Sequence, residues 1–124
     1  MTLEYREFVP AEILRRLDHD WEFLEEMVSL FPEQQADGIS RLQSALDRRC
    51  TADLKEAAHR FKGSVAILST GRLYDLLKTI EYASESELLA TGAALLPEVC
   101  SAIEALRWEL DHFLQTESPH AGSA

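Results

Sequence analysis

The stretch Leu54-Lys55-Glu56-Ala57-Ala58-His59-Arg60-Phe61-Lys62-Gly63-Ser64-Val65-Ala66-Ile67-Leu68 decides how this chain of 124 residues folds. Its apolar residues recur at helical spacing, and they are Leu54, Ala58, Phe61, Val65 and Leu68. Steps of three and four residues place them on one stripe of a helix. His59 lies one residue off that stripe, and Lys62 and Gly63 follow it at i+3 and i+4. The stretch therefore predicts a helix with a histidine at the edge of its buried face, beside a cation and a position without a side chain.

Apolar spacing of the same kind predicts helices before this stretch. Pro10 suits the first position of a short helix, and Asp18 suits the N-cap of a second one. Pro32 opens a third helix after a tight turn, although Gly38 weakens its interior. The three apolar stripes are Ile13, Leu14 and Leu17, then Trp21, Leu24, Val28 and Phe31, then Ile39, Leu42, Ala45 and Leu46.

The central helix and the one after it have recognisable ends. Thr51 is a suitable N-cap for the central helix, which is expected to end near Leu68. The next helix follows a break at residues 69–71, and either Ser69 or Thr70 can cap it. Its apolar stripe is Leu73, Leu76, Leu77 and Ile80.

The last helical segment is expected over about Glu87–Gln115, after a turn at residues 84–87. Pro97 either kinks this segment or marks its start. We find no strand-like alternation, so the sequence predicts an all-α protein. Its fold class is an antiparallel four-helix bundle with one or two short additional N-terminal helices. One domain is expected over residues 1–117, followed by a disordered tail over 118–124.

Charge distribution narrows the classes of partner. The net charge of −10 argues against a nucleic-acid binder. Residues 48–78 hold seven cations and three anions, a net charge of +4, so the one basic region surrounds His59. A basic patch on an acidic protein suggests an anionic partner, such as clustered carboxylates or a phosphoryl group. The alternative is that these cations are scattered around a helix and solvated.

The chain also lacks signals for membranes or export. No apolar run approaches the roughly 18–20 residues needed to cross a bilayer, and the first residues do not resemble a secretory signal. Cys50 and Cys100 are too few for a disulfide framework. We therefore expect a cytoplasmic monomer with two reduced thiols and no contact with a membrane.

Motifs for metal or cofactor chemistry are missing from the sequence. The other histidines are His19, His112 and His120, and no two histidines lie three or four residues apart. Without a Cys-x-x-Cys pair either, no metal site and no cofactor are expected. We assign these three histidines no role, and we expect Trp21 and Trp108 to lie in the core.

His59 differs from the other histidines because its neighbours make chemical sense together. A neutral imidazole nitrogen is a competent nucleophile near pH 7. Gly63 removes a side chain one turn away, at a cost of roughly 1 kcal/mol in helix stability relative to alanine. Lys62 can offset the charge of a phosphoryl group, and Arg60 and Lys55 extend the positive field. From the residues alone, a structural histidine at the rim of a bundle remains the alternative.

The segment Ala58-His59-Arg60-Phe61-Lys62-Gly63-Ser64 resembles the signature of histidine-containing phosphotransfer (Hpt) domains, His-x-Leu/Phe-Lys-Gly-Ser/Ala. The apolar residues and final polar residue of the family's next helix are matched by Leu73, Leu76, Ile80 and Glu81. The lead-in is matched more loosely by Phe31, Leu42, Ala45, Leu46, Asp53 and Leu54. The resemblance covers roughly residues 10–115 as architecture and is specific over about 59–81. In two places the chain departs from the pattern: Ser69 replaces the usual glycine, with Gly71 two residues later, and Val65 replaces a small residue.

This resemblance implies a mechanism. Hpt domains relay phosphoryl groups between aspartates of receiver domains in multistep two-component phosphorelays. His59 would attack an aspartyl phosphate through one ring nitrogen, Nε2, while Lys62 stabilises the transferred group and Gly63 gives access. The surrounding residues that could support the site are Lys55, Glu56, Arg60, Ser64 and Glu81. Of these, either Glu56 or Glu81 would orient the other ring nitrogen.

The resemblance also implies the partners. They would be receiver domains of response regulators or a hybrid sensor histidine kinase, with the magnesium ion held by the receiver. The protein would then be a phosphocarrier without autonomous turnover rather than an enzyme. Two alternatives stay open: a helical binding module that docks a receiver or kinase without phosphotransfer, and a bundle domain whose function is defined by a larger sensor kinase.

Overall fold

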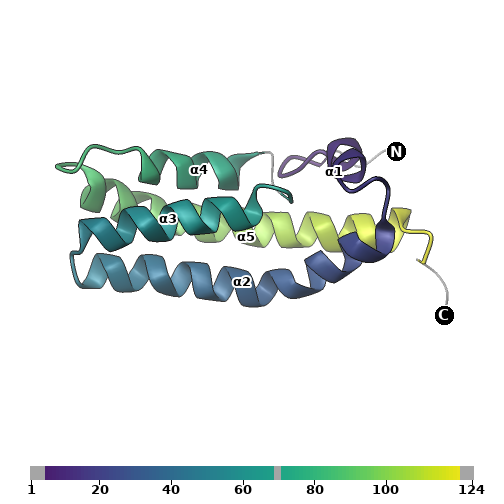
Figure 1. Cartoon of the computed structure of the whole chain (residues 1–124), viewed down its shortest axis with the longest axis horizontal. Coiled ribbons are helices and arrows are strands. Elements are labelled where there is room, and N and C mark those ends of the chain that lie inside the picture. Colours follow the sequence, from purple (N-terminus) through teal and green to yellow (C-terminus); the bar gives the residue numbers. More distant parts are fainter. Residues whose placement is uncertain (1–4, 69–70, 121–124) are drawn as a thin grey trace.

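The computed structural model describes residues 5–68 and 71–120, and these residues form five helices (Figure 1). The helices are α1 (Pro10–Arg16), α2 (Trp21–Asp47), α3 (Thr51–Val65), α4 (Arg72–Glu81) and α5 (Leu88–Glu117). Helices α2 to α5 form a closed bundle, because α2 packs on α3, α3 on α4, α4 on α5 and α5 on α2. The predicted all-α four-helix bundle with a short N-terminal helix is confirmed.

The bundle is asymmetric along its length. Helices α2 and α5 run its whole length, whereas α3 and α4 cover only one half (Figure 1). Over the other half lies α1, in line with α4. The apolar faces of the four bundle helices supply the core, which includes Leu54, Phe61, Leu77, Leu106 and Leu110. These packed stripes fix the position of α3 and α4, and therefore of the residues on their outer faces.

Close approach between α2 and α3 explains Gly38. A Cβ atom at this position would lie 2.5 Å from the Phe61 ring. Real Cβ atoms do not approach a ring so closely, so the glycine makes room for the aromatic side chain. The cost that Gly38 imposes on α2 as a helix is therefore offset by packing.

Two expected helices in the N-terminal half are one helix. The expectation that Pro32 opens a third helix is wrong, because Pro32 lies inside α2. The buried positions Val28, Phe31 and Gly38 continue the same stripe across the proline. Their burial outweighs the roughly 3 kcal/mol that an interior proline costs.

Several expected helix ends also lie elsewhere. Asp18 is not the N-cap of α2, because its backbone φ of 52° is left-handed. The N-cap is Asp20, whose carboxylate accepts from the backbone N–H of Phe23 at 3.0 Å. Helix α3 begins at Thr51 itself, after the N-cap Cys50.

The central helix is shorter than expected. The N-caps of α4 and α5 accept no side-chain hydrogen bond. Helix α3 ends at Val65 rather than near Leu68, and a turn follows. The N-cap of α4 is Gly71, while Ser69 and Thr70 lie outside the described residues. Helix α5 starts at Leu88, so Pro97 does not mark its start but lies within it.

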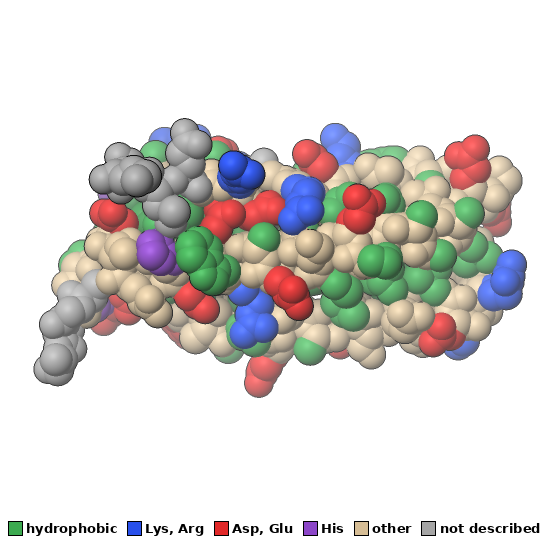
Figure 2. Space-filling view, turned by 180° about the vertical axis from the view of Figure 1, so that it is seen from behind, with side chains coloured by type: hydrophobic (Ala, Val, Ile, Leu, Met, Phe, Trp, Pro, Cys, Tyr) green, Lys and Arg blue, Asp and Glu red, His purple; other side chains and the backbone are tan. Residues whose placement is uncertain are grey.

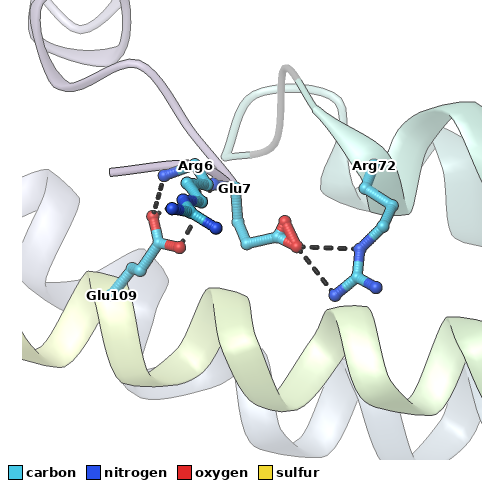
Figure 3. A network of polar contacts seen from close by, with 4 residues as sticks. All are labelled: Arg6, Glu7, Arg72 and Glu109. Carbon is cyan, nitrogen blue, oxygen red and sulfur yellow. Dashed lines mark hydrogen bonds and ion pairs between the residues drawn. The ribbon is translucent and has the colours of Figure 1, made fainter. Parts of the chain in front are cut away.

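Residues 5–16, which we call the N-terminal strap, are bound through Arg6 and Glu7 to Glu109 of α5 and to Arg72 at the start of α4 (Figure 3). The Glu109 carboxylate accepts from the backbone N–H groups of Arg6 at 2.7 Å and Glu7 at 3.0 Å. The Glu7 carboxylate in turn accepts from Arg72 Nε at 3.0 Å. Phe8 is buried against Phe113, with 5.6 Å between the ring centroids. The strap therefore closes the half of the bundle that α3 and α4 leave uncovered.

The C-terminal segment is bound over its first residues. Ser118 Oγ donates to Glu25 Oε1 at 2.6 Å, and His120 Nδ1 lies 2.8 Å from the same oxygen. These contacts differ from the disorder expected from residue 118 onward. Residues 121–124 lie outside the described part of the chain.

Helix α5 combines buried and exposed aromatic side chains. Trp21 of α2 stacks on its Phe113, as a core position requires. The expectation that Trp108 is also core is wrong, because its ring is exposed and stacks on His112.

By length and composition α5 alone among the described helices could cross a membrane, but here it packs as a core helix and carries the buried Glu109.

Candidate functional site

His59 is exposed on the outer surface of α3. Its side chain is 67% exposed, and its Nδ1 lies 2.5 Å from Oε1 of Glu81 on α4. A carboxylate only accepts hydrogen bonds, so Nδ1 carries the hydrogen and donates it. In the neutral ring Nε2 then has its lone pair free. The contact with α4 thus selects the tautomer and leaves the other ring nitrogen available for chemistry.

Glu81 is the last residue of α4 and its side chain is only 8% exposed. Burial by itself raises the pKa of this carboxyl, but the hydrogen bonds and charges of Lys62 and His59 outweigh it. The net effect lowers the pKa below its ordinary value. Glu81 is therefore ionised at neutral pH, as a hydrogen-bond acceptor for the imidazole must be.

Lys62 supplies the charge that balances this carboxylate. Its Nζ lies 2.6 Å from Glu81 Oε2, and its side chain is 12% exposed. The hydrogen bond to Glu81 raises the pKa of the ammonium above its ordinary value, and burial opposes this only in part. The Nζ atom also lies over the ring of Tyr82 at 5.1 Å and over that of Tyr74 at 5.8 Å from the centroids. One carboxylate therefore holds an exposed imidazole with one oxygen and a shielded ammonium with the other.

Gly63 leaves open space on the surface of α3. A Cβ atom there would meet no other side chain and no backbone outside its own helical segment within 4 Å. A methyl group at this position would therefore not touch the imidazole. Nothing in the packing of this chain explains the glycine, in contrast to Gly38. What the glycine provides is a flat surface one turn from His59.

The other residues proposed from the sequence lie around this site without contacting the imidazole. Arg60 pairs with Glu56 at 3.2 Å, so of the two candidate orienting carboxylates only Glu81 meets the ring. Ser64 Oγ donates to the backbone carbonyl of Phe61 at 2.9 Å. Lys55 is exposed one turn before the histidine. These side chains contribute charge and surface rather than a direct contact.

Tyr74 and Tyr82 are the site residues that the sequence reasoning missed. Tyr82 follows Glu81 directly as the C-cap of α4, and Tyr74 lies two turns earlier on the same helix. Their spacing of eight residues was a signal, because it brings both to the side of α4 that carries Glu81. Without the packing of α3 on α4, however, the spacing does not reveal that their rings face Lys62.

The surroundings of His59 are a surface and not a pocket. Several grooves on the described part of the chain have other linings. One groove of about 420 Å³ between α2 and α3 is lined by Arg41, Arg48 and Arg60. Each of these arginines is already paired with a carboxylate of its own neighbourhood. On the back of the molecule, acidic and basic side chains alternate with apolar ones (Figure 2). Among residues 5–68 and 71–120, no cluster of three metal-ligating side chains exists.

The site is thus an exposed, oriented imidazole beside a lysine on the outer surface of a helical bundle. A small substrate would have no enclosing pocket at this site. A family model of the Hpt domain matches residues 26–115. The chain therefore belongs to the Hpt domain family, whose members are phosphocarrier modules of phosphorelays and interact with receiver domains and histidine kinases.

The family match identifies which part of the structure is common to the family. It begins within α2 and ends near the end of α5, so the bundle and the site lie inside it. The N-terminal strap lies outside it. No curated protein and no solved structure matches the chain.

Proposed function

We propose that His59 is a phosphoacceptor that takes a phosphoryl group from an aspartate of one receiver domain and passes it to another. The observation that carries this proposal is the contact between His59 Nδ1 and the Glu81 carboxylate, from which the tautomer follows. Glu81 engages Nδ1, and the side chain is 67% exposed. Nε2 is therefore the nucleophile, and a protein as large as a receiver can reach it.

In the proposed forward step, the Nε2 lone pair attacks the phosphorus of the aspartyl phosphate. The N–P bond forms as the bond between phosphorus and the aspartyl oxygen breaks, and the aspartate leaves as a free carboxylate. The proton stays on Nδ1, where Glu81 balances the positive charge that develops on the ring. In the second step an aspartate of the next receiver attacks the phosphorus, and Nε2 leaves with its lone pair restored. No proton has to enter or leave the site, so the transfer depends on alignment and charge.

The neighbouring residues have separate roles in this proposal. Lys62 offsets the charge of the transferred phosphoryl group, because its ammonium shares Glu81 with the imidazole. Gly63 lets the receiver approach α3 without meeting a side chain. Lys55 and Arg60 add positive charge that attracts the acidic active site of a receiver. We expect the receiver to hold the magnesium ion.

The cellular setting follows as part of the same proposal. We expect a cytoplasmic monomer that binds neither nucleic acid nor a membrane, and that turns over no substrate without its partners. Its partners are receiver domains of response regulators or of a hybrid sensor histidine kinase. The net charge of −10 supports the exclusion of nucleic acid.

The experiment is labelling by phosphorylated receivers. The protein is incubated with each phosphorylated receiver of its organism and magnesium, and acid-labile, base-stable label is measured. We expect the wild-type protein to be labelled, the His59→Gln variant to carry no label, and the control variant His112→Gln to behave as the wild type. Label that persists in His59→Gln contradicts the proposal. A receiver that binds the wild-type protein tightly but never labels it points instead to a docking module without transfer.

A further inference from the structure

Lys62 is held more closely than a lysine on an outer helix surface ordinarily is. Its Nζ contacts Glu81 Oε2 at 2.6 Å and lies over the rings of Tyr82 and Tyr74 at 5.1 and 5.8 Å. The neighbouring Lys55 and Lys78 are both exposed, whereas the Lys62 side chain is 12% exposed. A carboxylate and two aromatic faces therefore enclose this one ammonium.

Tyr82 is in an unusual position for a large ring. It is 66% exposed, so burial in the core does not explain where it lies. As the C-cap of α4 it comes directly after Glu81, and this places its ring over the ammonium that Glu81 binds. Among the described residues its hydroxyl takes part in no hydrogen bond, so the face of the ring is the part in use.

We propose that Tyr82, together with Tyr74, is a positioning residue for phosphoryl transfer that holds the Lys62 ammonium in place beside the His59 imidazole. This inference rests on the proposed function and names how the lysine of that site is controlled. We call the three enclosing residues Glu81, Tyr74 and Tyr82 the lysine cage.

The physical reason lies in the flexibility of lysine. A lysine ammonium is a strongly hydrated point charge at the end of a flexible four-carbon stem, and it explores many positions when it is unrestrained. The negative faces of the two rings attract it, and their bulk removes part of its water shell. The charge then needs no reorganisation when the phosphoryl group arrives, which is the condition for effective electrostatic stabilisation.

Two variants separate the ring from the hydroxyl. Tyr82→Phe keeps the aromatic face, so we expect a single-turnover transfer rate within about twofold of the wild type. Tyr82→Leu keeps apolar bulk but loses the face, and we expect the transfer rate at saturating receiver to fall roughly threefold to tenfold. Because Tyr82 is exposed, both variants should fold, and thermal melting checks this.

A spectroscopic signature tests the cage without any transfer. Protons over an aromatic face resonate upfield, so the ε-methylene protons of Lys62 should be shifted upfield in the wild type and in Tyr82→Phe. In Tyr82→Leu they should move toward the position of the exposed Lys55. An unshifted Lys62 resonance in the wild type would overturn the proposal.

The decisive measurement is a double-mutant cycle with Lys62→Ala. If Tyr82 acts through the lysine, Tyr82→Leu should slow transfer in the wild-type background and have no further effect in the Lys62→Ala background. Equal effects in both backgrounds, or an effect on apparent receiver affinity alone, would mean that Tyr82 contacts the receiver and would overturn the positioning role. If the wild-type protein takes up no label, the proposed phosphoacceptor function itself is contradicted. If Tyr82→Leu transfers at the wild-type rate, only the role of the lysine cage is contradicted.

Discussion

Helix α4 has a buried glutamate cluster at each of its ends, and the two clusters hold different kinds of partner. At its C-terminal end Glu81 binds His59 and Lys62. At its N-terminal end Arg72 binds Glu7, whose backbone N–H donates to Glu109. The second cluster ties the N-terminal strap to the bundle, and its acceptors are filled by backbone and guanidinium groups. The first holds a ring that is largely in solvent.

The glycines that neighbour the two clusters in the sequence, Gly63 after Lys62 and Gly71 before Arg72, repeat this contrast. Gly63 faces open space, whereas a Cβ atom at Gly71 would lie 3.1 Å from the backbone oxygen of Glu7 and 3.2 Å from that of Arg6. Gly63 therefore leaves space at the molecular surface, whereas Gly71 makes room for the backbone of the N-terminal strap. Burial of a carboxylate therefore does not by itself mark a functional site. What separates the two clusters is the partner, an exposed imidazole at Glu81 and a guanidinium with backbone N–H groups at Glu7 and Glu109.

The largest expected effect concerns Glu81→Gln, which should slow phosphoryl transfer about tenfold to a hundredfold. The amide keeps the shape of the side chain but turns an NH₂ group toward either the imidazole or the ammonium, so one partner loses its position. Single-turnover labelling by a phosphorylated receiver measures the rate. Transfer at the wild-type rate would mean that Glu81 has no positioning role.

The matched change at the other end is Glu109→Gln. Both strap N–H groups donate to Glu109 Oε1, and that of Glu7 also lies 3.2 Å from Oε2. The amide would place an NH₂ group against the Glu7 N–H and remove the negative charge that strengthens these bonds. We expect the free energy of unfolding to fall by about 1–3 kcal/mol, as measured by urea titration, with transfer unchanged where the protein is folded. If Glu109→Gln slows transfer as much as Glu81→Gln does, the two ends of α4 are not functionally distinct.

Alanine at the two glycines gives changes of opposite sign. Gly71→Ala should lower the free energy of unfolding by about 1 kcal/mol, because the strap carbonyls must move away from the new methyl. Gly63→Ala should raise it by up to about 1 kcal/mol, since alanine favours the helix and meets no clash. Thermal melts of both variants measure this. A destabilised Gly63→Ala variant would show that its surroundings are less open than the structure has them.

The smallest expected effect is a difference in acid stability. The pKa of Glu81 is lower in the folded protein than its ordinary value. A carboxyl of this kind stabilises the fold above its unfolded-state pKa of about 4.3, and the contribution is lost as the pH falls through the folded-state value. Urea midpoints at pH 7 and pH 3.5 should therefore differ less for Glu81→Gln than for the wild type. An identical pH dependence in both proteins would contradict this assignment.

The fold could be predicted from the sequence because the helical spacing of apolar residues identifies the buried helix faces even where a local signal points elsewhere. The stripe from Leu54 to Val65 and the later stripes predicted the bundle correctly. The errors fall where tertiary packing overrides a local signal. Pro32 normally ends a helix, but the buried stripe continues across it. Trp108 has the spacing of a core residue, yet it is 58% exposed.

The site was predictable in its centre and less so in its periphery. His59, Lys62 and Gly63 lie within five consecutive residues of one helix, so their proximity follows from helical geometry. Glu81 is 22 residues further on, and only the packing of α3 against α4 decides between it and Glu56. The strap could not be foreseen, because its main contact joins residues more than a hundred positions apart.

The placement of both chain ends has a practical consequence for attaching other proteins. Tyr5 lies against Phe113 near the end of α5, and Ser118 is bound to Glu25 near the start of α2. Both ends thus leave the bundle on the side of α1, away from the half built by α3 and α4 (Figure 1). A fluorescent reporter or an affinity tag joined at either end should leave the His59 surface clear. Attachments at both ends at once should therefore leave the His59 imidazole accessible to a partner in solution.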